Sequence, residues 1–282
     1  MPDRANPLFE LRHVNLQYED TWALRDVSLA LYPGETRIIL GAAGSGKTTL
    51  LKALVGLVPI NSGDITLFGE DVTNLKEHDL YPLRSRTGIL FQEGALFDSL
   101  SVGENVEYPL INQVTGHDGH KTRQLFGDGT EKRVRETLNF VELEHTFDKF
   151  PSELSGGMRR RVGIARAIVT EPPLILYDSP TAGLDPITAN VIMALIAKER
   201  DVRNTASLIV TYRYQDGELM ANFRYDADRQ ELVPLTEEGG NHRRERTKFI
   251  VMKEGEIVFF GSREELESCT DEYVKRFVRH EE

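Results

Sequence analysis

The chain has 282 residues, of which 40% are hydrophobic and 28% are charged. This length is enough for one large α/β domain, or for a domain with an appended lobe, that buries a sizeable core. The formal net charge of -11 argues against a nucleic-acid-binding surface as the main function, because such surfaces are normally basic. We therefore expect no nucleic-acid partner.

Cysteine content and hydropathy both favour a cytosolic protein. Cys269 is the single cysteine, so the sequence offers no internal disulfide and no zinc-ligand spacing. No apolar run approaches the roughly 18 residues that span a bilayer, and residues 1–10 lack the apolar core of a signal peptide. We expect a soluble chain, and any membrane process it serves would need another polypeptide that crosses the membrane.

The first half of the chain opens with an expected antiparallel pair of strands. Residues 8–18 and 22–31 alternate apolar and polar side chains on either side of a short polar turn. Pro33 and Gly34 then turn the chain. In chain order, we expect further strands at 36–40, 63–68 and 87–91, and helices at 48–58, 71–86, 131–141 and 155–169.

The second half alternates short buried strands with helices. Residues 174–177 are wholly apolar, which suits a central parallel strand buried on both faces. Pro186 begins an expected helix to residue 200, since proline is favoured in a first helical turn. We also expect a strand at 206–211, a hairpin over 248–260 and a C-terminal helix at about 271–280.

Two polar stretches interrupt this pattern. Residues 112–130 are polar and glycine-rich, and residues 213–247 are polar and highly charged. We expect both to be solvent-exposed insertions without a packed core.

Residues 41–48, GAAGSGKT, predict a phosphate-binding loop. Gly41, Gly44 and Gly46 allow a tight backbone that aims N–H groups at a phosphate, and the following helix adds its positive end. Lys47 supplies a mobile charge for the β and γ phosphates, and Thr48 a hydroxyl for Mg²⁺. The other loop residues expected to contact the nucleotide are Ala43, Ser45 and Thr49.

Asp178 is the natural metal partner of this loop. It ends the apolar run 174–177, so its carboxylate is expected at the edge of a buried strand, where it could hold the magnesium ion that Thr48 also contacts.

A second anion-binding pattern lies at residues 154–158, LSGGM. Ser155 precedes a predicted helix, and Gly156 and Gly157 leave bare backbone amides at its start. A hydroxyl and free amides at a helix N-terminus are suited to receive an anion.

Together these motifs resemble those of ATP-binding cassette (ABC) proteins over nearly the whole chain. The resemblance implies an ABC transporter ATPase with an α/β fold: a P-loop NTPase-type, RecA-like parallel sheet core, an antiparallel β subdomain and a helical signature subdomain. It implies a single domain over 1–282, with the core and antiparallel part at about 8–92 and 171–262 and the helical subdomain at about 93–170.

The resemblance also implies a site shared between two chains. Ser155, Gly156 and Gly157 would contact the γ-phosphate of ATP held by an opposite subunit, so that two chains close head to tail around two ATP–Mg²⁺. Gln92 matches a glutamine that senses magnesium and the membrane partner, and Tyr18 matches an aromatic that stacks on adenine. Asp185 ends the segment 182–185, which matches a loop that crosses the dimer interface.

Finer features resemble one subfamily, the ATPases of mammalian-cell-entry (MCE) and maintenance-of-lipid-asymmetry (Mla) transporters. They are residues 91–110, Met158 in place of the usual glutamine, the arginines 159–161, and VFFGSREEL at 258–266. This resemblance implies phospholipid transport with a membrane permease and an MCE-domain lipid-binding protein, and a location on the cytoplasmic face of the inner membrane.

Two positions depart from the family. Ser179 stands where the family has the glutamate that polarises the attacking water, and Tyr212 stands where it has a histidine that contacts the γ-phosphate. An alcohol is a poor base, and a phenol donates a hydrogen bond without carrying positive charge. Losing a general base lowers rates by about 10² to 10⁴, so we expect nucleotide binding with slow hydrolysis.

The departures leave three explanations open: a degenerate partner in a heterodimer, a slowly hydrolysing homodimer, or substitutions made to trap an ATP-bound dimer. Three functions follow. The ATPase subunit of a lipid transporter is favoured, a regulatory nucleotide-binding module with little turnover is the alternative, and a cassette protein acting outside transport is disfavoured. The last class usually has two cassettes in one chain or a long coiled-coil insertion, and neither is present in the sequence.

Overall fold

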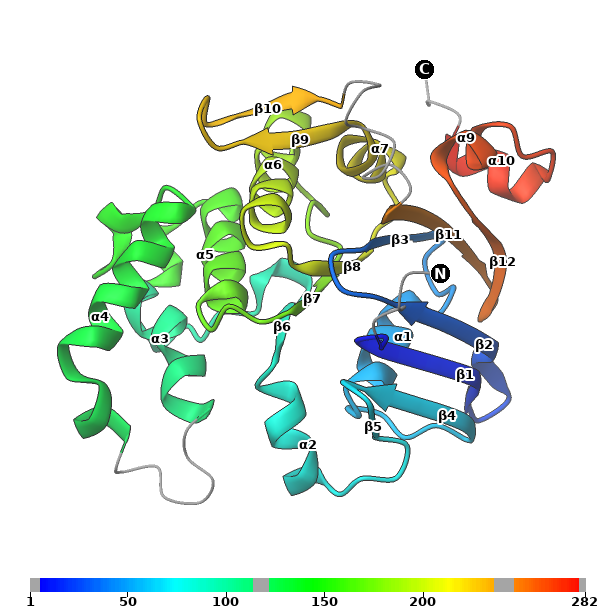
Figure 1. Ribbon diagram of the computed structural model, residues 1–282, viewed down its shortest axis with the longest axis horizontal. Helices are drawn as coiled ribbons and strands as arrows, with labels where there is room; N and C mark the ends of the chain where they lie inside the picture. The colour runs from blue at the N-terminus through cyan, green and yellow to red at the C-terminus, as the bar shows by residue number, and fades with distance from the viewer. Residues whose placement is uncertain (1–5, 114–121, 236–245, 279–282) are drawn as a thin grey trace.

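The computed structural model describes residues 6–113, 122–235 and 246–278. Within them, a six-stranded sheet in the order β12-β11-β3-β8-β7-β6 forms the centre of the molecule (Figure 1). All neighbours in this sheet are parallel except β11 and β12, which form an antiparallel hairpin. Its strands are β3 (Thr36–Gly41), β6 (Thr87–Leu90), β7 (Leu174–Asp178), β8 (Ala206–Val210), β11 (Thr247–Lys253) and β12 (Glu256–Gly261).

A separate four-stranded antiparallel sheet has the order β2-β1-β4-β5. Its strands are β1 (Phe9–Tyr18), β2 (Thr21–Leu31), β4 (Ser62–Leu67) and β5 (Glu70–Asp71). Helix α1 (Lys47–Leu54) lies between the two sheets and buries Leu50, Leu51 and Leu54 against both. The expected opening hairpin is therefore present, and its inner face closes a core over one side of the central sheet.

The opposite face of the central sheet is covered by helices. Ile38, Ile175 and Ile209 point from three parallel strands into a second core that contains apolar residues of these helices. Figure 1 shows α3, α4 and α5, in green, gathered on the side away from the four-stranded sheet. The helices of this face are α3 (Val102–Gln113), α4 (Thr122–Phe140), α5 (Gly156–Ile168), α6 (Pro186–Arg203) and α7 (Tyr214–Asn222).

The remaining elements are short. Helix α2 (Glu77–Arg84) is shorter than the expected 71–86, and the C-terminal part forms α9 (Arg263–Glu267) and α10 (Glu272–Val278). Single turns of 3-10 helix are η1 (Gln92–Gly94), η2 (Glu144–Thr146) and η3 (Pro151–Glu153). None of the helices in the described ranges combines the length and apolar character needed to cross a membrane.

The first predicted insertion, 112–130, is helical in the residues that the structure describes, which are 112–113 and 122–130. Helix α3 continues to Gln113 and α4 begins at Thr122, while residues 114–121 lie outside the described residues. The second half of α4 is anchored by the buried Val134 and Leu138. An anchored helix extends readily along the chain, because each added residue contributes a hydrogen bond without a new nucleation step.

The expectation of an extended insertion over 213–247 is also corrected. Helix α7 occupies 214–222, and β9 (Phe223–Asp226) pairs with β10 (Glu231–Pro234) in a hairpin. Residues 236–245 lie outside the described residues. Tyr214, Gly217 and Ala221 are buried and share one face of α7, but polar neighbours in the sequence hide this helical spacing.

Candidate functional site

The predicted phosphate loop joins the carboxyl end of β3 to α1 and requires glycine at Gly46. This residue has φ 101°, and a Cβ there would approach the Ala23 carbonyl oxygen to 2.2 Å. Gly44 also has a positive φ of 78°, but a Cβ there would meet open space. Residues 44 and 46 thus adopt a left-handed backbone that suits a loop folded around an anion.

Lys47 folds back over this loop. Its Nζ donates to the Gly41 carbonyl oxygen at 2.7 Å, to the Ala42 carbonyl oxygen at 2.8 Å and to Ser45 Oγ at 3.2 Å. Burial lowers the pKa of Lys47, and the nearby Asp178 charge opposes that effect. The ammonium group therefore lies at the phosphate loop, held by acceptors that it could exchange for phosphate oxygens.

Asp178 lies at the carboxyl end of β7 and is only 4% exposed. Its Oδ1 accepts a hydrogen bond from Ser179 Oγ at 3.1 Å. Thr48 is exposed on the first turn of α1, and Thr49 beside it is half-buried. Asp178 is close enough to the phosphate loop for its charge to oppose the lowering of the Lys47 pKa. The role of Asp178 as a metal-binding carboxylate stays a prediction.

Ser179 adopts a left-handed backbone with φ 50°, which is uncommon for a residue with a side chain. Its N–H donates to the Val210 carbonyl oxygen at 2.8 Å, so the residue is fixed to the end of β8. Tyr212 lies just beyond the end of the same strand, with 55% of its surface exposed. The two departures from the family therefore lie at the ends of neighbouring strands.

The predicted signature turn and Asp185 lie together. Ser155 caps α5 by accepting from the Met158 N–H at 3.2 Å, and Asp185 caps α6 by accepting from the Thr188 N–H at 3.0 Å. A Cβ on Gly157 would approach the Thr188 side chain to 2.6 Å, so the two helix starts are packed against each other. The Thr188 hydroxyl, which donates to Asp185, lowers the pKa of that carboxyl.

Tyr18 and Gln92 occupy exposed positions. Tyr18 is 51% exposed at the end of β1, in the hairpin whose Ala23 carbonyl closes on Gly46. Gln92 begins η1 and is separated from the end of β6 by one residue, Phe91. In the described ranges, no three His, Cys, Asp or Glu side chains cluster as a metal site.

Two contacts of this region were not predicted. Arg160, noted in the sequence only as part of an arginine run, is 3% exposed and donates to the carbonyl oxygens of Ser179 at 3.4 Å and Ala182 at 3.2 Å. Tyr273 on α10 accepts from the Ala42 N–H at 3.4 Å and donates to the Met252 carbonyl oxygen at 3.1 Å. Neither contact has a local sequence signal, because the partners are distant in the chain.

The fold and the phosphate loop define a P-loop nucleotide-binding protein. Residues 24–182 match the family described as ABC transporter. The chain is 34% identical to the intermembrane phospholipid transport system ATP-binding protein MlaF of Haemophilus influenzae, over 80% of this chain and 82% of that protein. It is 38% identical to the methionine import ATP-binding protein MetN of Corynebacterium efficiens, over 71% of this chain but only 53% of MetN.

A solved structure gives the same relationship. The dimeric ATP-binding cassette MJ0796, in a post-hydrolysis state bound to ADP and Pi, superposes with a TM-score of 0.71 and 29% identity, covering 90% of this chain and 98% of that one. The chain belongs to the ABC transporter family, as an ATP-binding subunit. The predicted α/β fold and the predicted family are both confirmed.

This family binds ATP with Mg²⁺, and the residues present fit that ligand. The left-handed glycines, the lysine already held by oxygen acceptors and the buried strand-end carboxylate are the groups a nucleotide triphosphate and its metal require. Bound ATP supplies the phosphoanhydride bond whose hydrolysis this family of P-loop enzymes catalyses.

Proposed function

We propose that the chain is the ATP-binding subunit of a phospholipid transporter of the MCE/Mla type. The observation that carries the lipid assignment is the similarity to MlaF, which extends over most of both chains. The similarity to MetN extends over about half of that protein. The subfamily features of the sequence, Met158 and the arginines 159–161 among them, support the same assignment.

In this proposal the chain acts as one ABC ATP-binding domain in a head-to-tail dimer, with itself or with a second ABC subunit. The dimer drives a transmembrane permease from the cytoplasmic face of the inner membrane, and an MCE-domain protein is a further partner. Residues 93–170 form the helical subdomain, which carries the signature turn.

We assign the residues of the site as follows. Tyr18 stacks on adenine, Lys47 binds the β and γ phosphates, and Asp178 holds Mg²⁺ with Thr48 and Gln92. Backbone groups of the phosphate loop, at Gly41, Ala43, Gly44, Ser45, Gly46 and Thr49, surround the phosphates. Ser155, Gly156, Gly157 and Asp185 complete the site of the opposite subunit.

Hydrolysis is slow in this proposal because of position 179. A glutamate there would offer a carboxylate to the attacking water, whereas the Ser179 hydroxyl donates to Asp178 and is itself no base at neutral pH. Tyr212 supplies no positive charge at the place of the family histidine. Binding is retained in this proposal, which the left-handed Gly44 and Gly46 and the buried Asp178 support.

Two experiments test the proposal. In sedimentation velocity, the purified chain should associate into a dimer on addition of ATP–Mg²⁺, and Lys47→Ala should stay monomeric. No association of the parent chain, alone or with a second ABC subunit, would contradict the dimer. For the substrate, the chain reconstituted with its permease in liposomes should move a labelled phospholipid in an ATP-dependent manner. ATP-dependent movement of methionine without phospholipid would contradict the lipid assignment.

The alternative function is a regulatory nucleotide-binding module, and Ser179 and Tyr212 are the observation that supports it. It predicts ATP-dependent dimerisation with turnover at background even when the permease and its lipid are present.

A further inference from the structure

A buried carboxylate links the segments that carry Ser179 and Tyr212, the two departures from the family. Asp216, on the first turn of α7, is 1% exposed. Its Oδ2 accepts two short hydrogen bonds, from Thr181 Oγ1 at 2.6 Å and from Thr211 Oγ1 at 2.7 Å. Both threonines are 1% exposed, so water does not compete for these bonds.

The two threonines come from different segments of the site. Thr181 lies two residues after Ser179, in the loop that leads to Asp185. Thr211 is the residue before Tyr212. One carboxylate oxygen therefore joins the loop after β7 to the segment after β8.

We propose that Asp216 is a positioning residue that holds the loop of Ser179 and the segment of Tyr212 in a fixed relation, so that a displacement of one is transmitted to the other. This inference rests on the proposed function for its role in ATP turnover, but not for the coupling itself.

The chemistry of the cluster makes the link strong. Hydrogen bonds from hydroxyls to a carboxylate are shorter and stronger than those between neutral groups. Burial raises the pKa of Asp216, and the two hydroxyls, together with Arg213, oppose that effect. Arg213 Nε lies 3.9 Å from Oδ1, and the Arg213 N–H donates to Thr211 Oγ1 at 3.1 Å. If either threonine moves away, a buried carboxylate loses a partner, which is unfavourable.

The loop of Ser179 is also held from its other side. Arg160 on α5 donates to the Ser179 and Ala182 carbonyl oxygens. The Ala182 N–H donates to the Ser179 carbonyl oxygen at 3.1 Å. The Leu184 N–H donates to the Thr181 carbonyl oxygen at 3.2 Å. A loop held by these hydrogen bonds moves as a unit, so a displacement of Thr181 also displaces the residues up to Leu184.

The hydroxyl of Thr181 offers a clean test, because the structure shows it donating to Asp216. Thr181→Val keeps the shape and removes the bond, and Thr181→Ser keeps the bond. Thr146→Val is the matched control, since Thr146 is 0% exposed and its hydroxyl donates to the Leu143 carbonyl oxygen at 2.7 Å, away from the site. The readout is hydrogen exchange of the backbone amides of residues 211–214, on the other segment.

The proposal predicts that Thr181→Val raises exchange at 211–214 about ten- to a hundredfold, the effect of losing one buried hydrogen bond to a charged group. Thr181→Ser and Thr146→Val should leave it within about twofold of the parent chain. Unchanged exchange at 211–214 in Thr181→Val, or an equal rise in Thr146→Val, would overturn the coupling.

Turnover gives a second readout in the Ser179→Glu, Tyr212→His chain. Adding Thr181→Val should lower kcat about tenfold with the Kd for ATP–Mg²⁺ changed less than about twofold. An equal loss in affinity and kcat would contradict a positioning role. Absence of ATP binding in the parent would refute the proposed function, while the exchange result would still decide the coupling.

Discussion

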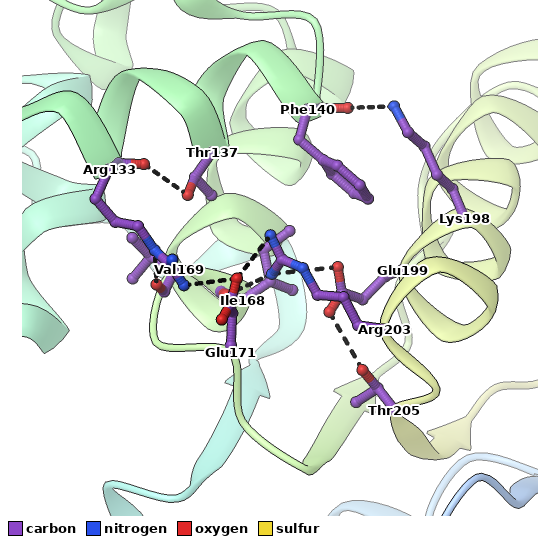
Figure 2. Close-up of polar contacts among 10 residues, drawn as sticks. All are labelled: Arg133, Thr137, Phe140, Ile168, Val169, Glu171, Lys198, Glu199, Arg203 and Thr205. Atoms are coloured by element: carbon purple, nitrogen blue, oxygen red, sulfur yellow. Dashed lines mark hydrogen bonds and ion pairs between the residues drawn. The ribbon is translucent and has the colours of Figure 1, made fainter. Parts of the chain in front are cut away.

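The buried Glu199 should make the stability of the chain depend on pH. It lies on α6 with 0% exposure, and burial raises its pKa to about 7, against the opposing charge of Arg203 and a hydrogen bond from Thr205 (Figure 2). Arg203 Nη1 lies 3.5 Å from Glu199 Oε2, an ion pair without hydrogen-bond geometry, and Thr205 Oγ1 donates to Oε1 at 3.3 Å. The perturbation is Glu199→Gln, which keeps the shape and removes the titration.

The charged neighbours of Glu199 limit how far Arg203 can neutralise it. Arg203 also lies 3.7 Å from Glu171, which pairs with Arg133 of α4 at 2.9 Å, and it donates to the Ile168 carbonyl oxygen (Figure 2). Arg203 is thus shared among several acceptors. Since the unfolded chain has a lower pKa at this position than the folded one, the folded state binds the proton more tightly between about pH 4.5 and 7.

The contribution of Glu199 to the free energy of unfolding is greatest below pH 4.5, falls as pH rises and is lost above about pH 7. The difference between 4.5 and about 7 corresponds to about 3 kcal/mol. Relative to the parent chain, Glu199→Gln should therefore be close to neutral near the acidic end of this range and more stable by about 3 kcal/mol at pH 8.

Urea denaturation of both chains at pH 5, 6, 7 and 8 measures this difference directly. Glu136→Gln, on the exposed face of α4, is the matched control and should follow the parent chain at every pH. A stability difference between Glu199→Gln and the parent that does not change with pH would refute the reasoning, as would a parent chain that is the more stable of the two at pH 8.

Two further predictions concern the phosphate loop. Gly46→Ala should destabilise the chain by about 1–3 kcal/mol and abolish ATP–Mg²⁺ binding, because of its φ of 101° and the Ala23 carbonyl oxygen. Gly44→Ala should have a smaller effect in the same thermal unfolding and titration measurements, and equal losses would contradict this account. Tyr273→Phe should weaken ATP–Mg²⁺ binding about two- to fivefold in calorimetry without changing the melting temperature by more than a few degrees, since it removes only the hydroxyl that braces Ala42. Unchanged affinity would show that this brace does not shape the loop.

Much of the fold could be predicted because its signals are local. The apolar run 174–177 is a fully buried central strand, and the glycine spacing of 41–48 gives the loop its backbone. Helix α7 was missed because its buried residues are separated by polar ones. The hairpin of β9 and β10 has half-buried strands, which leave a weak alternation in the sequence.

The motifs of the candidate site could be recognised in the sequence because each one is local in the chain. What could not be predicted are the groups that join those motifs from a distance. Thr181 and Asp216 are 35 residues apart, and Ala42 and Tyr273 are 231 residues apart. Such pairs meet only once the sheet has been assembled, and a single sequence carries no signal of their contact.

We propose that the chain binds ATP–Mg²⁺ normally but hydrolyses it slowly because of Ser179 and Tyr212. Steady-state hydrolysis and ATP–Mg²⁺ affinity, measured on the same samples of the parent chain and of Ser179→Glu with Tyr212→His, test it most directly. We predict similar affinities, and turnover in the double variant that exceeds the parent by about 10² or more. Rapid hydrolysis by the parent chain, at a rate that the double variant does not exceed, would contradict the claim and the role assigned to position 179.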